Sequence, residues 1–313
     1  MDRDGNSLAD QAGREKLALA VVVNKSWYEG YVPLFVHFAK RACPHAHVLV
    51  YVMGTPDPLV SETLDKLGIT PESYTIQSDF RLEYGNSALA AKTSRWTLPL
   101  CPIAQSYDQL YVGDIDILLC RETGDSLFVQ HQLHAERLGI PISNKVRVGS
   151  RRLTGLHYVQ TARYLESVLP AIEDLHQFLI DCQHNPQLFS EKYSEPGADE
   201  NVLYQLVESS EPEWIEQLSQ TSFRPHHGVH IGLFRSTPKP GEIGKAVESS
   251  ILDRNESAFH YWNDCAPELL RLFEHESTLP LFDAYPRVKA ACHSFLVFYR
   301  DWHNGAYQRL LAS

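Results

Sequence analysis

The stretch that decides the expected fold runs from Gln109 to Leu119 and reads QLYVGDIDILL. An apolar run ends at a glycine, two aspartates follow with one apolar residue between them, and a second apolar run then begins. In an extended chain residues i and i+2 point to the same face, so Asp114 and Asp116 should project together while Ile115 turns back into the core. The expected context is a strand end in an open α/β sheet, where ligands bind beyond the carboxyl ends of the strands.

These two carboxylates predict a bound cation. On one face they would repel each other and lose hydration. The usual compensation is a hard divalent ion with oxygen ligands, so Asp114 and Asp116 are expected to hold Mn²⁺ or Mg²⁺, with Gly113 and Ile115 beside the ligand. An acidic turn between two short strands would place the same residues without a ligand, and the motif alone leaves both interpretations open.

The composition is that of a globular protein and limits the classes of ligand that it could bind. The chain has 313 residues, 43% hydrophobic and 21% charged, and a net charge of −11. The negative charge disfavours a nucleic-acid partner, which needs a basic face, but not a small phosphorylated ligand neutralised locally by a metal. The sequence holds no apolar run of the ~20 residues that a transmembrane helix needs. Scattered cysteines without a C-x-x-C pair, and a polar segment 1–16 without a signal-peptide core, favour a cytoplasmic protein with a disordered tail.

Alternating apolar and amphipathic segments predict the fold class. Strands are expected at 17–23, 48–53 and 73–76, and helices at 31–43, 57–67 and 86–105. This order, which ends at the strand that carries the aspartates, favours an α/β fold with a doubly wound, mainly parallel sheet flanked by helices.

The second half of the chain is less regular. The sequence predicts a strand at 144–148 ended by Gly149, a long helix at 158–179 interrupted near Pro170, a short helix at 199–207, and closing helices at 258–273 and 285–311. We therefore expect a tail at 1–16, one catalytic domain at 17–240 and a helical extension of that domain at 241–313.

The loop after the first strand is a candidate nucleotide site. In a doubly wound sheet a nucleotide commonly lies at this position, here from Val23 and Asn24 to Trp27 and Tyr28. The amide of Asn24 can bind the edge of a base, and either aromatic ring can stack on it. The aromatics could equally cover the edge of the sheet, and the sequence does not decide between the two.

Two helical segments carry further candidates. Lys92 and Arg95 are three residues apart and could both approach a diphosphate. Arg95 is the better candidate because a guanidinium binds anions in a bidentate way, whereas Lys92 fits an exposed basic face. In the segment 197–203, which reads GADENVL, Asp199 is either a helix N-cap or a carboxylate that grips sugar hydroxyls.

The segment 224–232 reads RPHHGVHIG and is unusually rich in histidine. A neutral imidazole can add a nitrogen ligand to a metal held by carboxylates, so His227 or His230 is expected to line the site. These two residues are three apart, so they would share a face only if the segment bends. The sequence leaves the choice between them open.

Taken together, these segments resemble the GT-A glycosyltransferases, and most closely the glycogenin and lipopolysaccharide galactosyltransferase group, family 8. Residues 93–118 are similar to the family's Arg, Pro-Leu, Tyr-Asp and Asp-x-Asp block, and 197–203 to its Asp-Gln-x-x-Leu-Asn element. The family's usual Asp and Gln are Asn24 and Glu200 here, and its His-Phe-x-Gly-x-x-Lys-Pro-Trp motif is present only in part, around 227–232.

The resemblance implies a metal-dependent hexosyltransferase that moves a sugar from a nucleotide sugar, in the first place a UDP-sugar, to an acceptor hydroxyl. Asp114 would contact the ribose and the metal, and Asp116 would ligate Mn²⁺ or Mg²⁺ with His230 or His227. Arg95 would act near the diphosphate and Asp199 would hold the donor sugar. Glu200 is a possible base if the reaction inverts configuration.

Two other functions stay open at the level of sequence. The aspartates and histidines could form a metal-dependent hydrolase of phosphoesters or nucleotides, which would break down its substrate at a rate indifferent to an acceptor alcohol. The same scaffold could also bind a nucleotide sugar without turnover. The sequence does not identify the donor sugar, nor whether the acceptor is a glycan, a lipid-linked sugar or a small molecule.

Overall fold

A computed structural model describes residues 16–24, 29–78, 92–121, 127–185, 187–193, 198–221, 228–234 and 257–303. Its main feature is a six-stranded sheet in the order β3-β2-β1-β4-β7-β6. The strands are β1 (Leu17–Asn24), β2 (His47–Met53), β3 (Tyr74–Gln77), β4 (Gln109–Val112), β6 (Ile142–Ser143) and β7 (His157–Gln160). The first four are parallel to one another, while β7 is antiparallel to both β4 and β6. The prediction of a mainly parallel, doubly wound α/β sheet is confirmed.

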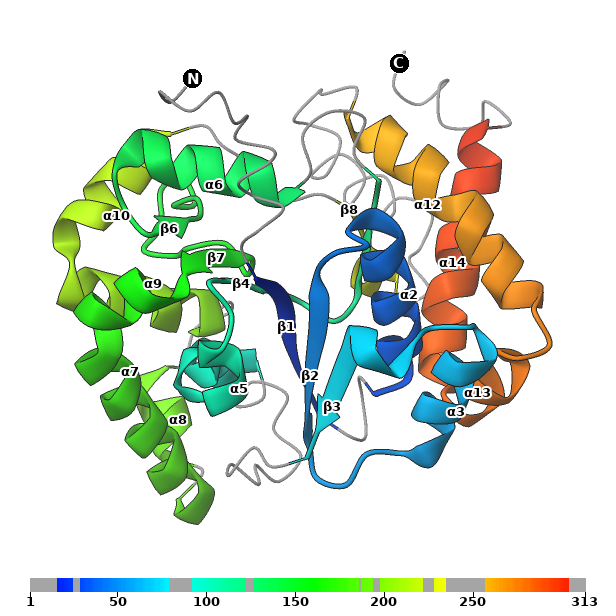
Figure 1. The fold of residues 1–313 in the computed structure, drawn as a ribbon, viewed down its shortest axis with the longest axis horizontal. Helices are drawn as coiled ribbons and strands as arrows, with labels where there is room; N and C mark the ends of the chain where they lie inside the picture. The colour runs from blue at the N-terminus through cyan, green and yellow to red at the C-terminus, as the bar shows by residue number, and fades with distance from the viewer. Residues whose placement is uncertain are drawn as a thin grey trace.

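Helices cover both faces of this sheet. The helices of the first half are α2 (Val32–Ala42), α3 (Pro58–Lys66), α5 (Pro102–Gln105) and α6 (Leu127–Leu138), with short 3-10 turns η1 (Glu29–Tyr31), η2 (Pro71–Ser73) and η3 (Arg95–Leu100). Those of the second half are α7 (Thr161–His184), α8 (Gln187–Lys192), α9 (Ala198–Ser210), α10 (Pro212–Ser219), α12 (Ser257–Glu274), α13 (Leu279–Ala284) and α14 (Pro286–His303). Figure 1 shows α7, α9 and α10 on one side of the strands and α2, α12 and α14 on the other.

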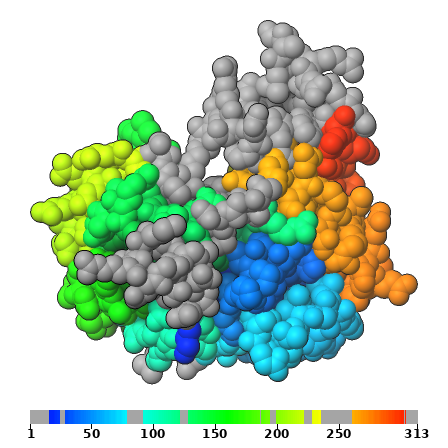
Figure 2. Space-filling view, turned by 45° about the horizontal axis from the view of Figure 1, so that its top comes forward, coloured from blue at the N-terminus to red at the C-terminus, as the bar shows by residue number. Residues whose placement is uncertain are grey.

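The alternation of side chains along the strands explains the two layers. In β1, Leu19 and Val21 pack with α2 and the C-terminal helices, whereas Ala18 and Ala20 pack with η3, α7 and α9. Because successive strand residues point to opposite faces, a run that is apolar throughout serves both cores. Figure 2 shows the residues of α6 to α10 in green and those of α12 to α14 in orange to red, on opposite flanks of the blue and cyan N-terminal segments.

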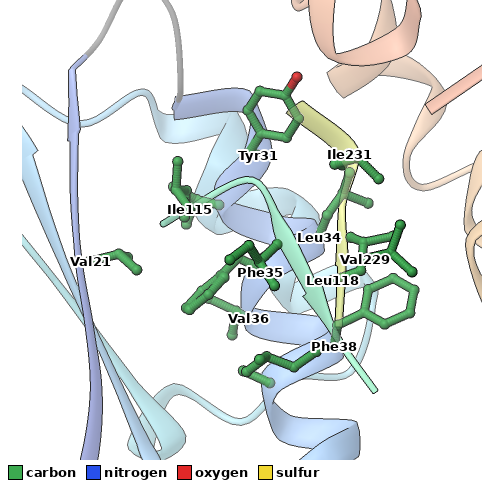
Figure 3. Packing of buried hydrophobic residues seen from close by; sticks show 14 of the residues in the cluster. Val21, Tyr31, Leu34, Phe35, Val36, Phe38, Ile115, Leu118, Val229 and Ile231 are labelled. Atoms are coloured by element: carbon green, nitrogen blue, oxygen red, sulfur yellow. The ribbon is translucent and has the colours of Figure 1, made fainter. Parts of the chain in front are cut away.

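A second, two-stranded sheet lies next to the first and carries part of the site. It pairs β5 (Ile117–Leu119) with β8 (Gly228–His230) in antiparallel fashion, and the 3-10 turn η4 (Ile231–Phe234) follows. Ile115 is 6% exposed and belongs to the same apolar cluster as the side chains of α2. Figure 3 shows it near Phe35 of that helix. Ile115 therefore turns into the core as predicted. In this region α2 packs against β5, α12 against β8 and α14 against η4.

Several predicted elements are wrong in detail. The helix predicted at 86–105 is present only in part: residues 92–94 and α5 are helical, Arg95–Leu100 is a 3-10 turn that contains Pro99, and residues 79–91 lie outside the described part. Residues 144–148 form no strand but make an isolated bridge between Val146 and Leu153. The helix α7 runs through Pro170 without a break, because it packs against the core on both sides of the proline. None of the helices in the described ranges is long and apolar enough to cross a membrane.

Candidate functional site

The candidate site lies where the order of the sheet reverses. β1 is the shared neighbour of β2 and β4, so the chain winds outward in both directions from it. Open α/β sheets bind ligands beyond the carboxyl ends of the strands at this point. Here β1 ends at Asn24 and β4 at Val112, and the backbone N–H of Gly113 donates to the carbonyl of Ala20 at 3.1 Å. Asp114 follows directly, so the Asp-x-Asp pair begins at the expected edge of the sheet.

Arg95 is buried at the start of η3 and bridges two carboxylates. One guanidinium nitrogen donates to Asp114 Oδ1 and the other terminal nitrogen to Asp199 Oδ2, the second at 2.7 Å. The guanidinium lies 4.3 Å from the centre of the Trp96 ring, whose Nε1 donates to the backbone oxygen of Asp199 at 2.8 Å. Asp199 is therefore not an N-cap: it lies in the first turn of α9, and its carboxylate binds Arg95.

The charges of this bridge stabilise one another. Burial would raise the pKa of Asp114, but the charge of Arg95 holds it below its usual value. Burial would also lower the pKa of Arg95, and the charges of Asp114 and Asp199 raise it instead. Both groups stay ionised, since opposite charges at contact distance favour the charged forms. Arg95 thus supplies for Asp114 the positive charge that the sequence assigned to a metal.

Asp116 has a different partner, on the second sheet. The extended conformation expected for the two aspartates is wrong, because residues 115 and 116 form a turn between β4 and β5. The register of the second sheet pairs Ile117 with His230, and the backbone N–H of Ile231 donates to the carbonyl of Asp116 at 3.0 Å. This pairing brings His230 Nε2 to 2.9 Å from Asp116 Oδ1. The two aspartates therefore serve two separate pairs.

Asp116 and His230 are the donor set that best fits a divalent cation. A carboxylate oxygen and an imidazole nitrogen suit Mn²⁺, and burial lowers the pKa of His230, which favours the neutral ring that binds metals. In the described ranges no group of three or more His, Cys, Asp and Glu side chains is arranged to hold an ion. Substrate oxygens would therefore complete the coordination, as they often do at sites with one or two protein carboxylates. His227, the alternative ligand, lies outside the described residues.

Asn24 is the polar side chain at the end of β1. It is 6% exposed, and neither amide atom has a hydrogen-bond partner among the described residues. Because buried amides normally have partners, this edge of the sheet suits a polar ligand group. Val23 instead packs into the core and Lys92 is exposed, so neither side chain contributes to the edge. Trp27 and Tyr28 fall in a segment that the structure does not describe.

Glu200 lies beside the bridge and forms an ion pair with Arg147, which comes from the connection between β6 and β7. Burial raises the pKa of Glu200, although the charge of Arg147 opposes the shift. A raised pKa brings a carboxylate closer to the range in which a general base works. The ion pair with Arg147 favours the charged form of this carboxylate and occupies it.

Two residues of the site were not predicted from the sequence, Arg147 and Gly155. A Cβ at Gly155 would lie 2.9 Å from Arg95 Nη2 and 3.0 Å from Asp114 Oδ2, so the absence of a side chain lets the connection approach the ion pair. Arg147 belongs to a basic stretch, Lys145 to Arg152, that was visible in the sequence. No comparable pattern in the sequence marks Gly155.

Comparison with known proteins gives limited results. No family model matches the sequence, and no curated protein matches it. Among solved structures, the glycosyltransferase GlyE of Streptococcus pneumoniae TIGR4 aligns at 13% identity and a TM-score of 0.39, over 63% of this chain and 44% of that one.

Two further structures align over similar shares of this chain. The galactosyltransferase LgtC in complex with donor and acceptor sugar analogs aligns at 14% identity and a TM-score of 0.35, over 60% of this chain and 70% of that one. The bifunctional glycosyltransferase WbbM aligns at 9% identity and a TM-score of 0.39, over 63% of this chain and 38% of that one. The matched part thus spans less than half of GlyE and of WbbM. Scores of this size assign neither a family nor an activity to this chain.

Proposed function

We propose that this protein is a glycosyltransferase that moves a sugar from a nucleotide-sugar donor, in the first place a UDP-sugar, to an acceptor hydroxyl with the help of Mn²⁺ or Mg²⁺. The observation that carries the proposal is the convergence of Asn24, Asp114 and the Asp116–His230 pair beyond the carboxyl ends of β1 and β4. This set offers groups for a base, a ribose and a metal-bound diphosphate at one edge. The resemblance of the Asp-x-Asp block to GT-A enzymes agrees with it.

Each residue of the site has a role in this proposal. The amide of Asn24 binds the edge of the base, and Asp114 accepts from the ribose hydroxyls. Asp199 accepts from hydroxyls of the donor sugar. Arg95 holds both carboxylates in place from a buried position, which keeps their oxygens oriented before the donor arrives.

Asp116 and His230 would hold the metal. Bound there, a divalent cation neutralises the diphosphate as it leaves the sugar. If configuration is retained, no strong base is needed. If it is inverted, Glu200 accepts the proton of the acceptor hydroxyl once Arg147 has moved away from it.

The first test is thermal unfolding with UDP, GDP, CDP and ADP, each with and without Mn²⁺. A ligand that binds only the folded protein raises the melting temperature. The proposal expects a shift for one nucleoside diphosphate that is larger with the metal. A shift with metal alone and none for any nucleotide would favour the hydrolase, and binding of a nucleotide sugar without transfer to any acceptor would favour the non-catalytic module.

Matched variants connect that result to the site. Asp116→Asn keeps the shape of the side chain and should abolish the metal-dependent part of the shift. Asp283→Asn removes a carboxylate that is 72% exposed on α13 and should leave the shift unchanged. Equal shifts in both variants would contradict the assignment of the metal to Asp116.

A further inference from the structure

The connection between β6 and β7 is a basic hairpin at the side of the site. Residues 145–152 read KVRVGSRR and include no acidic residue, in a chain whose net charge is −11. The hairpin closes through the bridge between Val146 and Leu153 and a bond from the Arg147 N–H to the Arg152 carbonyl at 2.8 Å. Its tip turns at Gly149, where φ is +69°. Such a concentration of positive charge is suited to an anion.

The base of this hairpin is fixed to the site. The side chain of Asn144 is fully buried, and its Oδ1 accepts from the backbone N–H of Lys145 at 2.6 Å and of Thr154 at 3.0 Å. Its Nδ2 lies 3.1 Å from His157 Nδ1 on β7. Gly155 then packs against the Arg95–Asp114 pair. Arg147, near the base of the hairpin, is therefore held at a defined place beside the Arg95–Asp114 pair.

Two arginines of the hairpin form ion pairs with α9, at different distances from the site. Arg147 pairs with Glu200 and Arg151 with Glu208. The two glutamates are eight residues apart, which is about 12 Å along a helix, so only the first pair lies next to Asp199. The side chain of Glu200 is 13% exposed, whereas that of Arg147 is 48% exposed and accessible to a ligand.

Arg147 is held near the site through its partner Glu200. Glu200 directly follows Asp199, whose carboxylate accepts from Arg95 at 2.7 Å, and the backbone N–H of Leu153 in the hairpin donates to the carbonyl of Glu200 at 3.3 Å. Arg147 therefore lies beside the Arg95 bridge, next to the edge where the diphosphate of the proposed donor would lie. Arg95 is already engaged by two carboxylates, so a basic side chain that contacts the diphosphate alongside the proposed metal must come from elsewhere.

We propose that Arg147 is a binding residue for the diphosphate of the nucleotide sugar, and that it exchanges its ion pair with Glu200 for the phosphate oxygens when the donor enters. This inference rests on the proposed function and names a residue that takes part in it. A guanidinium is suited to the exchange because it binds carboxylate and phosphate with the same two-pronged geometry. Its departure also releases Glu200 at the moment when the acceptor must be activated.

The test is a calorimetric titration with the nucleoside diphosphate that raises the melting temperature, in the presence of Mn²⁺, and with the matching nucleoside. Arg147→Ala should bind the diphosphate about tenfold more weakly and the nucleoside unchanged, since it loses a charge-assisted contact to phosphate only. Arg147→Lys should recover part of the affinity. Glu200→Gln should bind the diphosphate more tightly, because the competing carboxylate is gone.

Arg151→Ala is the matched control, because it removes the same charge from the same hairpin and the same kind of pair with α9. It should bind the diphosphate within about twofold of the unmodified protein, as expected for an exposed charge away from the ligand. If Arg147→Ala binds as tightly as the unmodified protein, or if both variants lose affinity equally, the proposal is wrong.

Inorganic pyrophosphate separates this proposal from the proposed function. If no nucleoside diphosphate binds but pyrophosphate binds in a way that needs Arg147, the anion site is supported and the glycosyltransferase is not. If a nucleoside diphosphate binds Arg147→Ala as well as it binds the unmodified protein, the glycosyltransferase is supported and the role of Arg147 is not. If neither ligand binds the unmodified protein, both proposals fail.

Discussion

The two aspartates of the Asp-x-Asp pair lie in two regions that bury different partners of their ion pairs. We call the region of Arg95 and Asp114 the arginine side, and that of Asp116 and His230 the histidine side. On the arginine side, the Arg95 side chain is 4% exposed and Asp114 is 25% exposed. On the histidine side, the carboxylate of Asp116 is 4% exposed and His230 is 31% exposed. The first region hides its cation and the second presents its nitrogen ligand to solvent. Two residues separated by a single isoleucine therefore have different physical roles.

This difference suggests that one side stabilises the fold and the other binds the ligand. A fully buried cation that joins three elements contributes to the fold, because removing it leaves buried carboxylates without compensation. A half-exposed imidazole beside a buried carboxylate contributes little to the fold and is accessible to a ligand. We therefore expect changes on the arginine side to act on stability, and changes on the histidine side to act on metal binding.

The largest effect is expected for Arg95→Ala. The variant leaves Asp114 and Asp199 without their cation, so the free energy of unfolding should fall by about 3–5 kcal/mol. Urea denaturation measures this loss. The control is Arg121→Ala, since Arg121 is 61% exposed and its partner Asp264 keeps Arg41, so the loss there should be about 0–1 kcal/mol. Similar losses in the two variants would contradict the structural role of the bridge.

A fall in pH is expected to have the next largest effect on stability. Burial, and secondly the charge of Arg95, lower the pKa of His157 to about 3, and burial lowers that of His134 to about 4. Both rings are neutral in the folded protein and bind protons first in the unfolded chain, whose histidines titrate near pH 6.5. Stability is therefore complete above about pH 6.5 and is lost as the pH falls towards the folded pKa values.

The histidine contribution can be isolated with one variant. Between pH 7 and pH 5.5 the two rings together should cost about 2 kcal/mol of unfolding free energy, as measured by urea denaturation at each pH. In His157→Gln this pH-dependent loss should be smaller by about 1 kcal/mol, because one of the two proton sites is gone. An unchanged loss in the variant would mean that His157 does not titrate in this range.

The strands and their two faces could be predicted from sequence, whereas the site could be predicted only in part. Apolar runs such as 17–23 determine a buried strand locally, because every side chain needs cover. The contact between Arg95 and Asp199 spans 104 residues, so no local pattern reveals it. The sequence therefore left Asp199 open between a helix cap and a ligand-binding carboxylate, whereas the structure shows its carboxylate bound to Arg95.

The position of His230 also depends on long-range pairing, whereas His227 lies outside the described residues. The sequence left His227 and His230 as equal candidates, because their spacing alone does not show which ring points to the site. The register that pairs Ile117 with His230 places that ring beside Asp116. Such a register depends on how β5 packs against α2 and β8 against α12, which is a property of the assembled core.

A smaller effect is expected for Gly155→Ala. The added methyl group would press on both members of the Arg95–Asp114 pair, so the free energy of unfolding should fall by about 1–3 kcal/mol. Gly113→Ala is a suitable control because its Cβ would meet Leu156 at 3.4 Å, an ordinary contact. If Gly113→Ala is the more damaging variant in urea denaturation, the close approach at Gly155 does not constrain the pair.

The smallest effect on stability, and the sharpest on ligand binding, is expected for His230→Gln. Glutamine keeps a polar group near Asp116 and replaces a ring that is 31% exposed, so the free energy of unfolding should change by about 0–1 kcal/mol. The shift of melting temperature that Mn²⁺ adds to a nucleoside diphosphate should nevertheless disappear, because the nitrogen ligand is lost. If this variant instead loses as much stability as Arg95→Ala and keeps the metal effect, the two halves of the Asp-x-Asp pair have the opposite roles.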